Sequence, residues 1–255
     1  MDGKRILTDP MLSDYAFPLE VFAPKRFNPS PLTVEQLPAI DIVTISHDHF
    51  DHLDMRTVQV LAKKGAQFFV GIGIKAHLNR WGIADNQIHE MDWWESIAVD
   101  NFKIHCTPAR HYSGRTGFNN STLWTSWVIE SPNHKVFHSG DSGYAEHFKE
   151  IGNKFGFIDI AFIKIGDYGE DPGWRDIHMH TKNSIQVAKD INANFMLPIH
   201  WGTFELSYHD WDEPIELSVK YSNELNQTLV TPKLGLTIKL KSKVSNEYWW
   251  RALKK

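Results

Sequence analysis

The sequence contains a single cysteine, Cys106, among its 255 residues. One cysteine cannot build an internal disulfide framework, so the chain fits a reducing compartment. The sequence has no apolar run near the roughly 20 residues needed to cross a bilayer. Its first residues, Met1 to Arg5, lack the apolar core of a signal peptide. We therefore expect a cytoplasmic protein without a transmembrane segment.

The sequence also has no block of basic residues, and its formal net charge is −4. Binding of nucleic acid is therefore not indicated. No Gly-x-Ser-x-Gly segment is present, and Cys106 lies inside a strand-like stretch, so neither a serine nor a cysteine nucleophile is expected. Without repeats, low-complexity tracts or long linkers, residues 1–255 are expected to form one domain.

Hydrophobic patterning predicts strands and helices that are interspersed along the chain. The expected strands are Ile6–Thr8, Ile40–Ser46, Gln67–Val70, Phe102–Thr107, Thr122–Glu130, Lys135–Ser139, Ile158–Ile165, Asn194–Ile199 and Leu234–Leu240. The expected helices are Met55–Lys63, Lys75–Trp81, Ala145–Ile151, Lys182–Asn192 and Pro214–Glu224. This order favours sheets that are covered by helices.

The densest chemical signal is the segment His47-Asp48-His49-Phe50-Asp51-His52, which has the spacing HxHxDH. It directly follows the buried-strand pattern of residues 40–45. Neutral imidazoles and carboxylates are the usual ligands of zinc and neighbouring metals. A chance surface cluster in a chain with 14 histidines is the alternative. The preceding strand and the matching residues downstream favour a metal site.

Three further segments repeat the order of a strand followed by a ligand-type residue: His111, Asp141 and His200 each follow a strand pattern. A lone residue of this kind is more often structural, but four such segments together are hard to explain in that way. Two metal ions roughly 3.5–4 Å apart need about seven ligands and usually one shared carboxylate. The candidate ligands are His47, His49, Asp51, His52, His111, Asp141 and His200.

These residues and the motifs around them resemble the metallo-β-lactamase superfamily. More narrowly, they are similar to the branch that contains N-acyl-phosphatidylethanolamine-hydrolysing phospholipase D and its bacterial relatives. The HxHxDH loop is typical of the superfamily. The motifs typical of the branch include Trp93-Trp94, His111-Tyr112-Ser113-Gly114-Arg115 and His200-Trp201-Gly202-Thr203-Phe204.

The resemblance implies a fold, a ligand set and cofactors. The fold would be α/β, a metallo-β-lactamase-type αβ/βα sandwich of two mixed sheets flanked by helices. Two divalent ions would be bound, zinc being expected and manganese or iron being the alternatives. The first ion would be held by His47, His49 and His111, the second by Asp51, His52 and His200, and both by Asp141.

The sequence departs from the family pattern in two places. Relatives open with a strand that carries a Trp-x-Gly-His-Ala-like motif, and we expect this first strand to be missing here through truncation or a misassigned start. Relatives also carry a Gly-Ala-Tyr-x-Pro-Arg-Trp-like segment where this chain has Gly-Asp-Tyr-Gly-Glu-Asp-Pro-Gly-Trp-Arg at residues 166–175. The family places that segment near the substrate, so the departure bears on substrate identity.

The favoured function is a phosphodiesterase of the phospholipase D type, in which a metal-bridging hydroxide attacks phosphorus. Its substrate would be a small or lipid-like phosphodiester, with the many Trp and Phe residues lining the cleft. Asp51 and His178 are the catalytic candidates. The resemblance implies that His178 donates a hydrogen bond to the scissile group, with His180 as its local competitor and helix capping as the structural alternative.

Other functions and roles stay open at this point. A lactonase or other ester or amide hydrolase is the main alternative, and a non-catalytic metal-binding protein is a third. Asp9 and Asp54 could orient ligand imidazoles or could serve as turn and cap residues. The oligomeric state is also open, a homo-oligomer included.

Overall fold

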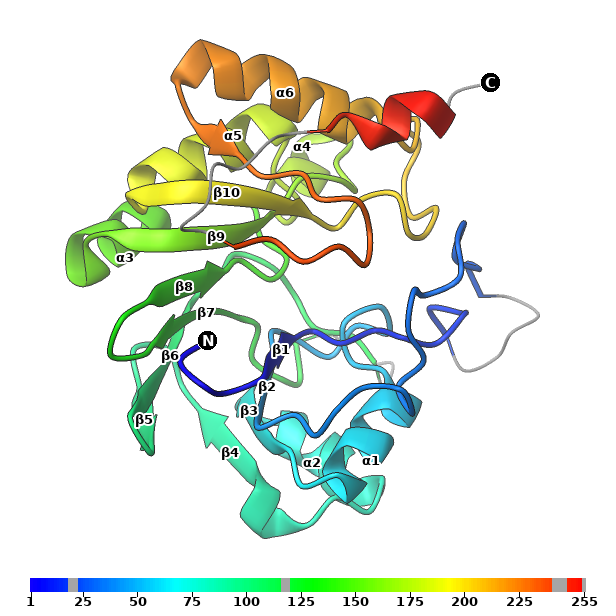
Figure 1. Ribbon diagram of the computed structural model, residues 1–255, viewed down its shortest axis with the longest axis vertical. Helices are drawn as coiled ribbons and strands as arrows, with labels where there is room; N and C mark the ends of the chain where they lie inside the picture. The colour runs from blue at the N-terminus through cyan, green and yellow to red at the C-terminus, as the bar shows by residue number, and fades with distance from the viewer. Residues whose placement is uncertain (18–22, 116–119, 240–246, 254–255) are drawn as a thin grey trace.

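The computed structural model describes residues 1–17, 23–115, 120–239 and 247–253. Two sheets lie face to face in it (Figure 1). The smaller sheet has the order β1-β2-β3-β4 and parallel pairings throughout. Its strands are β1 (Ile6–Thr8), β2 (Ile42–Ile45), β3 (Gln67–Gly71) and β4 (Ile88–Met91).

The larger sheet is mixed and has the order β11-β10-β9-β8-β7-β6-β5. Pairings from β5 to β8 are antiparallel, and those from β8 to β11 are parallel. Its strands are β5 (Ser96–Val99), β6 (Phe102–Pro108), β7 (Thr125–Glu130), β8 (Lys135–His138), β9 (Ile158–Lys164), β10 (Ala193–Ile199) and β11 (Thr228–Leu229).

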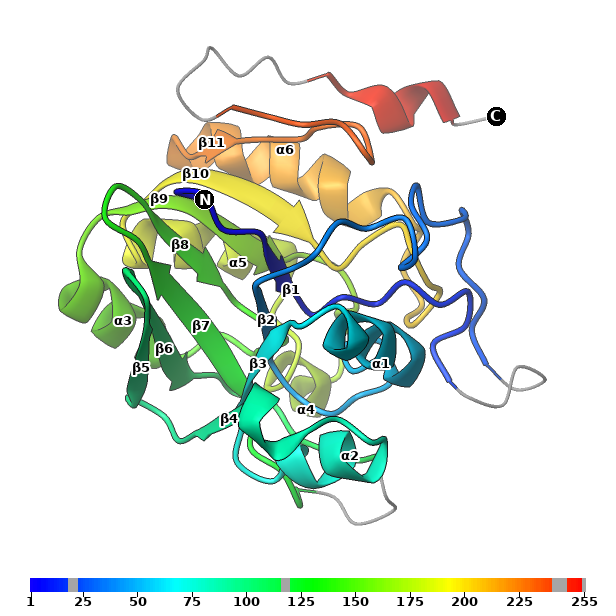
Figure 2. The same ribbon diagram turned by 60° about the horizontal axis from the view of Figure 1, so that its bottom comes forward.

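Helices cover the outer face of each sheet, which completes the αβ/βα sandwich (Figures 1 and 2). Helices α1 (Met55–Lys63) and α2 (Ile74–Arg80) pack on the smaller sheet. Helices α3 (His147–Phe155), α5 (Thr181–Asp190) and α6 (Glu213–Leu225) pack on the larger sheet, and a short α4 (Pro172–Arg175) precedes α5. Short 3-10 turns occupy Asp85–Gln87 and Trp249–Leu253. The fold predicted from the motifs is confirmed.

The alternation of strand side chains explains the layers. In β3, Phe68 packs among the residues that face α1 and α2, whereas its neighbour Phe69 packs in the core between the sheets. Successive strand residues point to opposite faces, so a strand in a middle layer must be apolar on both. All four residues of β2 are buried for this reason. The resulting rigid layers hold the loops at the strand ends.

Several predicted elements need correction. Residues 234–239 form no strand, and Leu240 lies outside the described residues. Gly235 has a φ of +85°, and Leu234 and Leu236 are 57% and 62% exposed, so this apolar stretch is a surface turn. Strands β4, β5 and β11 were not predicted, because all three are short edge strands. Among the described residues no helix is both long and apolar enough to cross a membrane.

Candidate metal centre

The predicted ligands come from loops that follow four strands. His47, His49, Asp51 and His52 follow β2, His111 follows β6, Asp141 follows β8 and His200 follows β10. Because these strands end at the same edge of the sandwich, residues far apart in sequence meet there. The ligand atoms fall into two groups, each with all its atoms within 4.8 Å of one another. One group is His47, His49 and His111, and the other is Asp51, His52, Asp141 and His200.

The first group consists of three imidazoles whose ring nitrogens face one another. Nε2 of His47 and Nε2 of His111 lie 2.9 and 3.2 Å from Nδ1 of His49. Burial lowers the pKa of His47 well below its usual value and the pKa of His111 to about 3. Neutral imidazoles are the form that binds metals. Ligand atoms about 2.0–2.1 Å from one tetrahedral ion lie roughly 3.3 Å apart, so the spacing suits a shared cation.

The second group pairs two imidazoles with two carboxylates. Nε2 of His52 lies 3.3 Å from Asp51 and 3.2 Å from Asp141, and Nε2 of His200 lies 3.2 and 3.3 Å from the same carboxylates. Burial opposes the charged form of His52, yet Asp141 and Asp51 raise its pKa well above the usual value. The carboxylates therefore concentrate negative charge where a cation would lie.

Two buried atoms of this group test whether it fits a cation. His52 Nε2 and Asp141 Oδ1 are shielded from solvent and have no hydrogen-bond partner. Buried polar atoms without partners are costly, and a divalent ion at this point would satisfy both. The donor types, imidazole and carboxylate, also match the preferences of zinc and related metals. The residues therefore fit divalent metal ions.

Asp141 lies between the two groups. Besides its place in the second group, its carboxylate falls within 4.8 Å of the ring nitrogens of His111 and His178. The preceding Gly140 has a φ of +53°, and a Cβ there would lie 2.6 Å from Ser46 Cβ and 2.8 Å from the Thr125 carbonyl oxygen. Only glycine fits this turn, which brings Asp141 to the centre.

Hydrogen bonds behind the imidazoles fix their orientation. Asp9 Oδ2 lies 2.7 Å from His52 Nδ1, and the Asp9 carboxylate also accepts from the backbone N–H of Ser46 at 2.7 Å. The His111 Nδ1–H donates to the Ile177 carbonyl at 3.1 Å. Such contacts fix which nitrogen of each ring faces the metal. Asp54 instead caps α1 and accepts from Arg56 N–H and Ser13, so of its two expected roles the structure shows capping.

Arg115 braces the HxHxDH loop, a role that the sequence did not reveal. Its Nη1 donates to the carbonyls of Asp48 and Leu53 at 3.0 and 2.8 Å. The guanidinium lies over the rings of Phe50 and Trp81, 4.2 and 4.9 Å from their centroids. Planar Arg combines stacking with several donors in this way. The loop is thus held at both ends by one side chain.

His178 lies against the centre, whereas His180 does not. His178 is buried, and its Nδ1 is 2.8 Å from Lys164 Nζ and 3.8 Å from Asp141 Oδ2. His180 accepts a hydrogen bond from the Lys182 N–H and caps α5, which is the structural role considered for His178. Lys164 and Asp167, the latter 3.3 Å from His178 Nε2, were not predicted as site residues. The signal for Lys164 was a lysine at the end of a mostly apolar strand.

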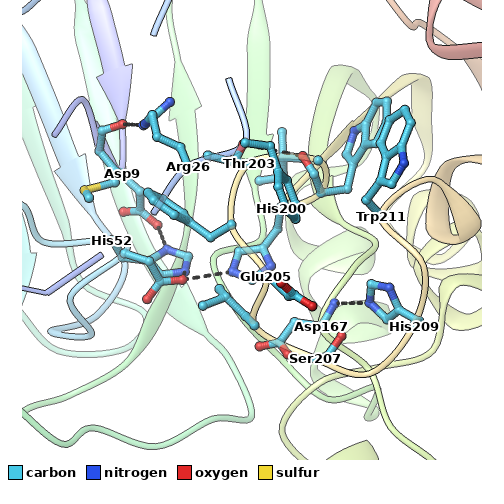
Figure 3. Close-up of a pocket in the computed structure, with 18 of the residues that line it drawn as sticks. Asp9, Arg26, His52, Asp167, His200, Thr203, Glu205, Ser207, His209 and Trp211 are labelled. Carbon is cyan, nitrogen blue, oxygen red and sulfur yellow. Dashed lines mark hydrogen bonds and ion pairs between the residues drawn. The ribbon is translucent and has the colours of Figure 1, made fainter. Parts of the chain in front are cut away.

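A cavity of about 580 Å³ opens over the second group (Figure 3). Phe27, Phe204, Tyr208 and Trp211 contribute aromatic surface to it, beside polar side chains such as Asp167. The motif residues Trp93 and Trp94 are not among the residues that line it. Trp93 instead donates from Nε1 to the Trp124 carbonyl at 2.8 Å, near the ends of β4 and β5. Of the two aromatic branch motifs, the one after His200 therefore shapes the cavity.

Comparisons with known proteins agree with this architecture. The family model of the β-lactamase superfamily domain matches residues 4–201. An uncharacterized protein of Mycobacterium tuberculosis is 40% identical over 255 residues, which cover 98% of this chain and 68% of the relative. N-acyl-phosphatidylethanolamine-hydrolyzing phospholipase D 1 of Caenorhabditis elegans is 36% identical over 220 residues, which cover 81% of this chain and 61% of the relative.

A solved structure, the isothiocyanate hydrolase from Delia radicum gut bacteria, aligns with a TM-score of 0.71 at 20% identity. The alignment covers 94% of this chain and 93% of that one, which shows a shared fold. This chain therefore belongs to the metallo-β-lactamase superfamily, a class of metal-dependent hydrolases. Within that class it is similar to the N-acyl-phosphatidylethanolamine-hydrolysing phospholipases D, the branch that its motifs resemble.

Proposed function

We propose that this protein is a phosphodiesterase that uses two divalent metal ions. His47, His49 and His111 would hold one ion, Asp51, His52 and His200 the other, and Asp141 both. The observation that carries this proposal is the position of Asp141, whose carboxylate lies among the ligand atoms of the second group and near His111. A shared carboxylate is the usual link in two-metal hydrolases. Zinc suits the donor set best, with manganese or iron as alternatives.

When bound, the ions would acidify a water molecule and offset the negative charge of the transition state. The side chains of this chain then have separate tasks. Asp51, within 3.3 Å of both His52 and His200, is placed to hold and orient the attacking water as well as a metal. His178 lies against Asp141 through Nδ1, and its Nε2–H would donate a hydrogen bond to the scissile group.

The choice of a phosphodiester rests on two supports. The relatives in this branch carry the name of a phospholipase D, and the cavity combines aromatic surface with the polar centre. Such a cavity suits an ester with an apolar part. A single cysteine, Cys106, leaves no internal disulfide, which supports the cytoplasmic location that forms part of this proposal.

Turnover and metal content test the proposal together. The protein is loaded with zinc, manganese or iron, its metal content is measured, and it is assayed with bis(p-nitrophenyl) phosphate, glycerophospholipids and a lactone series. We expect two ions per chain and hydrolysis of the diesters that a chelator abolishes. Hydrolysis of lactones alone, with the diesters untouched, would refute the phosphodiesterase.

One observation favours a second candidate, a lactonase or other hydrolase of uncharged esters. Apart from the ligand groups and Asp167, the cavity lining includes the carboxylates of Glu205 and Asp210 against one guanidinium, Arg26. Carboxylates around a cleft repel an anionic diester and admit a neutral ester more readily. The same panel of substrates separates these two functions.

A further inference from the structure

Cleavage of an ester leaves an alkoxide, and an alkoxide of an ordinary alcohol departs slowly unless it receives a proton. The groups beside the centre that could supply one include His178 and Asp167. The contacts of each show whether it can give a proton away or only donate a hydrogen bond.

His178 is constrained by Lys164. The Lys164 side chain is fully buried, and its Nζ lies 2.8 Å from His178 Nδ1. An ammonium group can only donate, so Nδ1 accepts and the single ring proton sits on Nε2. The ring is therefore neutral, and its N–H can orient a substrate but is a poor proton source.

Asp167 is held beside His178 by its own backbone. Its N–H donates to His209 Nε2 at 2.9 Å, and its carbonyl accepts from Trp174 Nε1 at 2.9 Å. These bonds support a φ of +56°, a left-handed conformation that non-glycine residues adopt at a cost of roughly 1–2 kcal/mol. The carboxylate points away from His209 into the pocket (Figure 3).

The Asp167 carboxyl group has few partners of its own. Oδ2 lies 3.3 Å from His178 Nε2, and Oδ1 is buried without a hydrogen-bond partner. Burial raises the pKa of this carboxyl group. A protonated carboxyl group in such a place has a proton to give.

We propose that Asp167 is the general acid of this site and that it protonates the leaving-group oxygen, while Lys164 keeps His178 in the form that only donates a hydrogen bond. The inference rests on the proposed function in that the metal centre must cleave an ester bond. The bond between phosphorus and the leaving oxygen breaks as the bond from phosphorus to the water oxygen forms. The proton of Asp167 passes to the leaving oxygen, and the proton lost by the attacking water restores the carboxyl group through solvent.

The test compares leaving groups of different basicity. Metal-loaded wild type and the Asp167→Asn variant are assayed with the p-nitrophenyl, phenyl and benzyl esters of methyl phosphate, and in parallel with the same esters of acetic acid. Asparagine keeps the size of the side chain and tolerates the left-handed conformation, so the variant is expected to fold. The matched control is Glu170→Gln, a carboxylate-to-amide change at an exposed position of the same segment.

We expect Asp167→Asn to lower kcat/KM for the benzyl ester by about 100-fold or more, the size of a general-acid contribution, and for the p-nitrophenyl ester by less than about tenfold. The stable p-nitrophenolate needs no proton on departure. Glu170→Gln should leave all the rates near those of wild type. A loss of equal size for every leaving group would overturn the role of Asp167.

The two ester series separate this inference from the proposed function. If wild type cleaves the phosphate esters and Asp167→Asn lowers kcat/KM equally for every leaving group, only the general-acid role of Asp167 is overturned. If wild type cleaves only the acetate esters, the phosphodiesterase is refuted. If Asp167→Asn then loses more kcat/KM with the benzyl than with the p-nitrophenyl ester, the general-acid role of Asp167 is supported. Absence of turnover of both series by wild type would overturn both proposals.

Discussion

Asp9 Oδ2 lies 2.7 Å from His52 Nδ1, and this contact turns Nε2 of the same ring toward Asp51 and Asp141. Asp9 sits directly after β1 in a left-handed conformation, with a φ of +40°. The backbone N–H of Ser46 donates to its other oxygen at 2.7 Å. The end of one strand thus orients a candidate ligand that follows the neighbouring strand.

From this relationship we expect Asp9→Asn to weaken metal binding by about 10–100-fold, the usual cost of losing a carboxylate behind a ligand histidine. The reason is that an amide orients the ring less firmly and leaves it less basic. Competition with a fluorescent chelator measures the affinity. Asp54→Asn, the same change at the cap of α1, should shift the affinity by less than about twofold because asparagine also caps helices. Equal affinities for wild type and Asp9→Asn would remove Asp9 from this role.

For Asp141→Asn we expect weaker binding of both ions and loss of turnover. An amide has one acceptor oxygen and no charge, so it cannot serve two cations as a carboxylate does. Metal content after dialysis, followed by calorimetric titration, reports each ion separately. A variant that keeps two ions and near-normal activity would rule out a bridging Asp141.

Replacing Arg115 tests the brace on the HxHxDH loop. We expect Arg115→Lys to lower the free energy of unfolding by about 1–3 kcal/mol, since lysine cannot reproduce both hydrogen bonds and the stacking between Phe50 and Trp81. Urea denaturation of the metal-free protein gives this value. Arg110→Lys is the control, because Arg110 forms an exposed ion pair with Asp176 and should cost less than about 1 kcal/mol. Similar losses of unfolding free energy in the two variants would contradict the proposed role of Arg115 in holding the HxHxDH loop.

His147 gives a pH dependence that does not involve the metal ligands. Burial lowers the pKa of His147 from 6.5 to about 4 in the folded protein. Between these values the unfolded chain binds a proton that the folded protein does not, so stability falls as the pH drops below about 6.5.

We therefore expect the free energy of unfolding of the metal-free wild type to fall more steeply between pH 6.5 and pH 4 than that of His147→Gln. The difference between the two curves should change by about 2 kcal/mol over this range. Urea titrations at several pH values measure it. Parallel curves would show that His147 keeps the same pKa in the folded and unfolded states.

The sequence by itself determined the layered fold and the local part of the candidate site. The apolar side chains of β2 can be buried on both faces only if the strand lies in a middle layer of the sandwich. Three histidines and Asp51 in one short loop lie close together without any distant contact. The downstream ligands could be named because each follows a strand and because the motifs resemble a known family.

Only the tertiary structure decided what the remaining residues do. The sequence marks Lys164 only as a lysine in a mostly apolar strand, and its partner His178 is known only from the structure. Asp167 faces the pocket because His209 and Trp174 hold its backbone. Trp93 has an aromatic signature in the sequence but lies outside the cavity lining. Such roles depend on contacts between segments far apart in the chain, and these contacts cannot be predicted from the pattern of neighbouring residues.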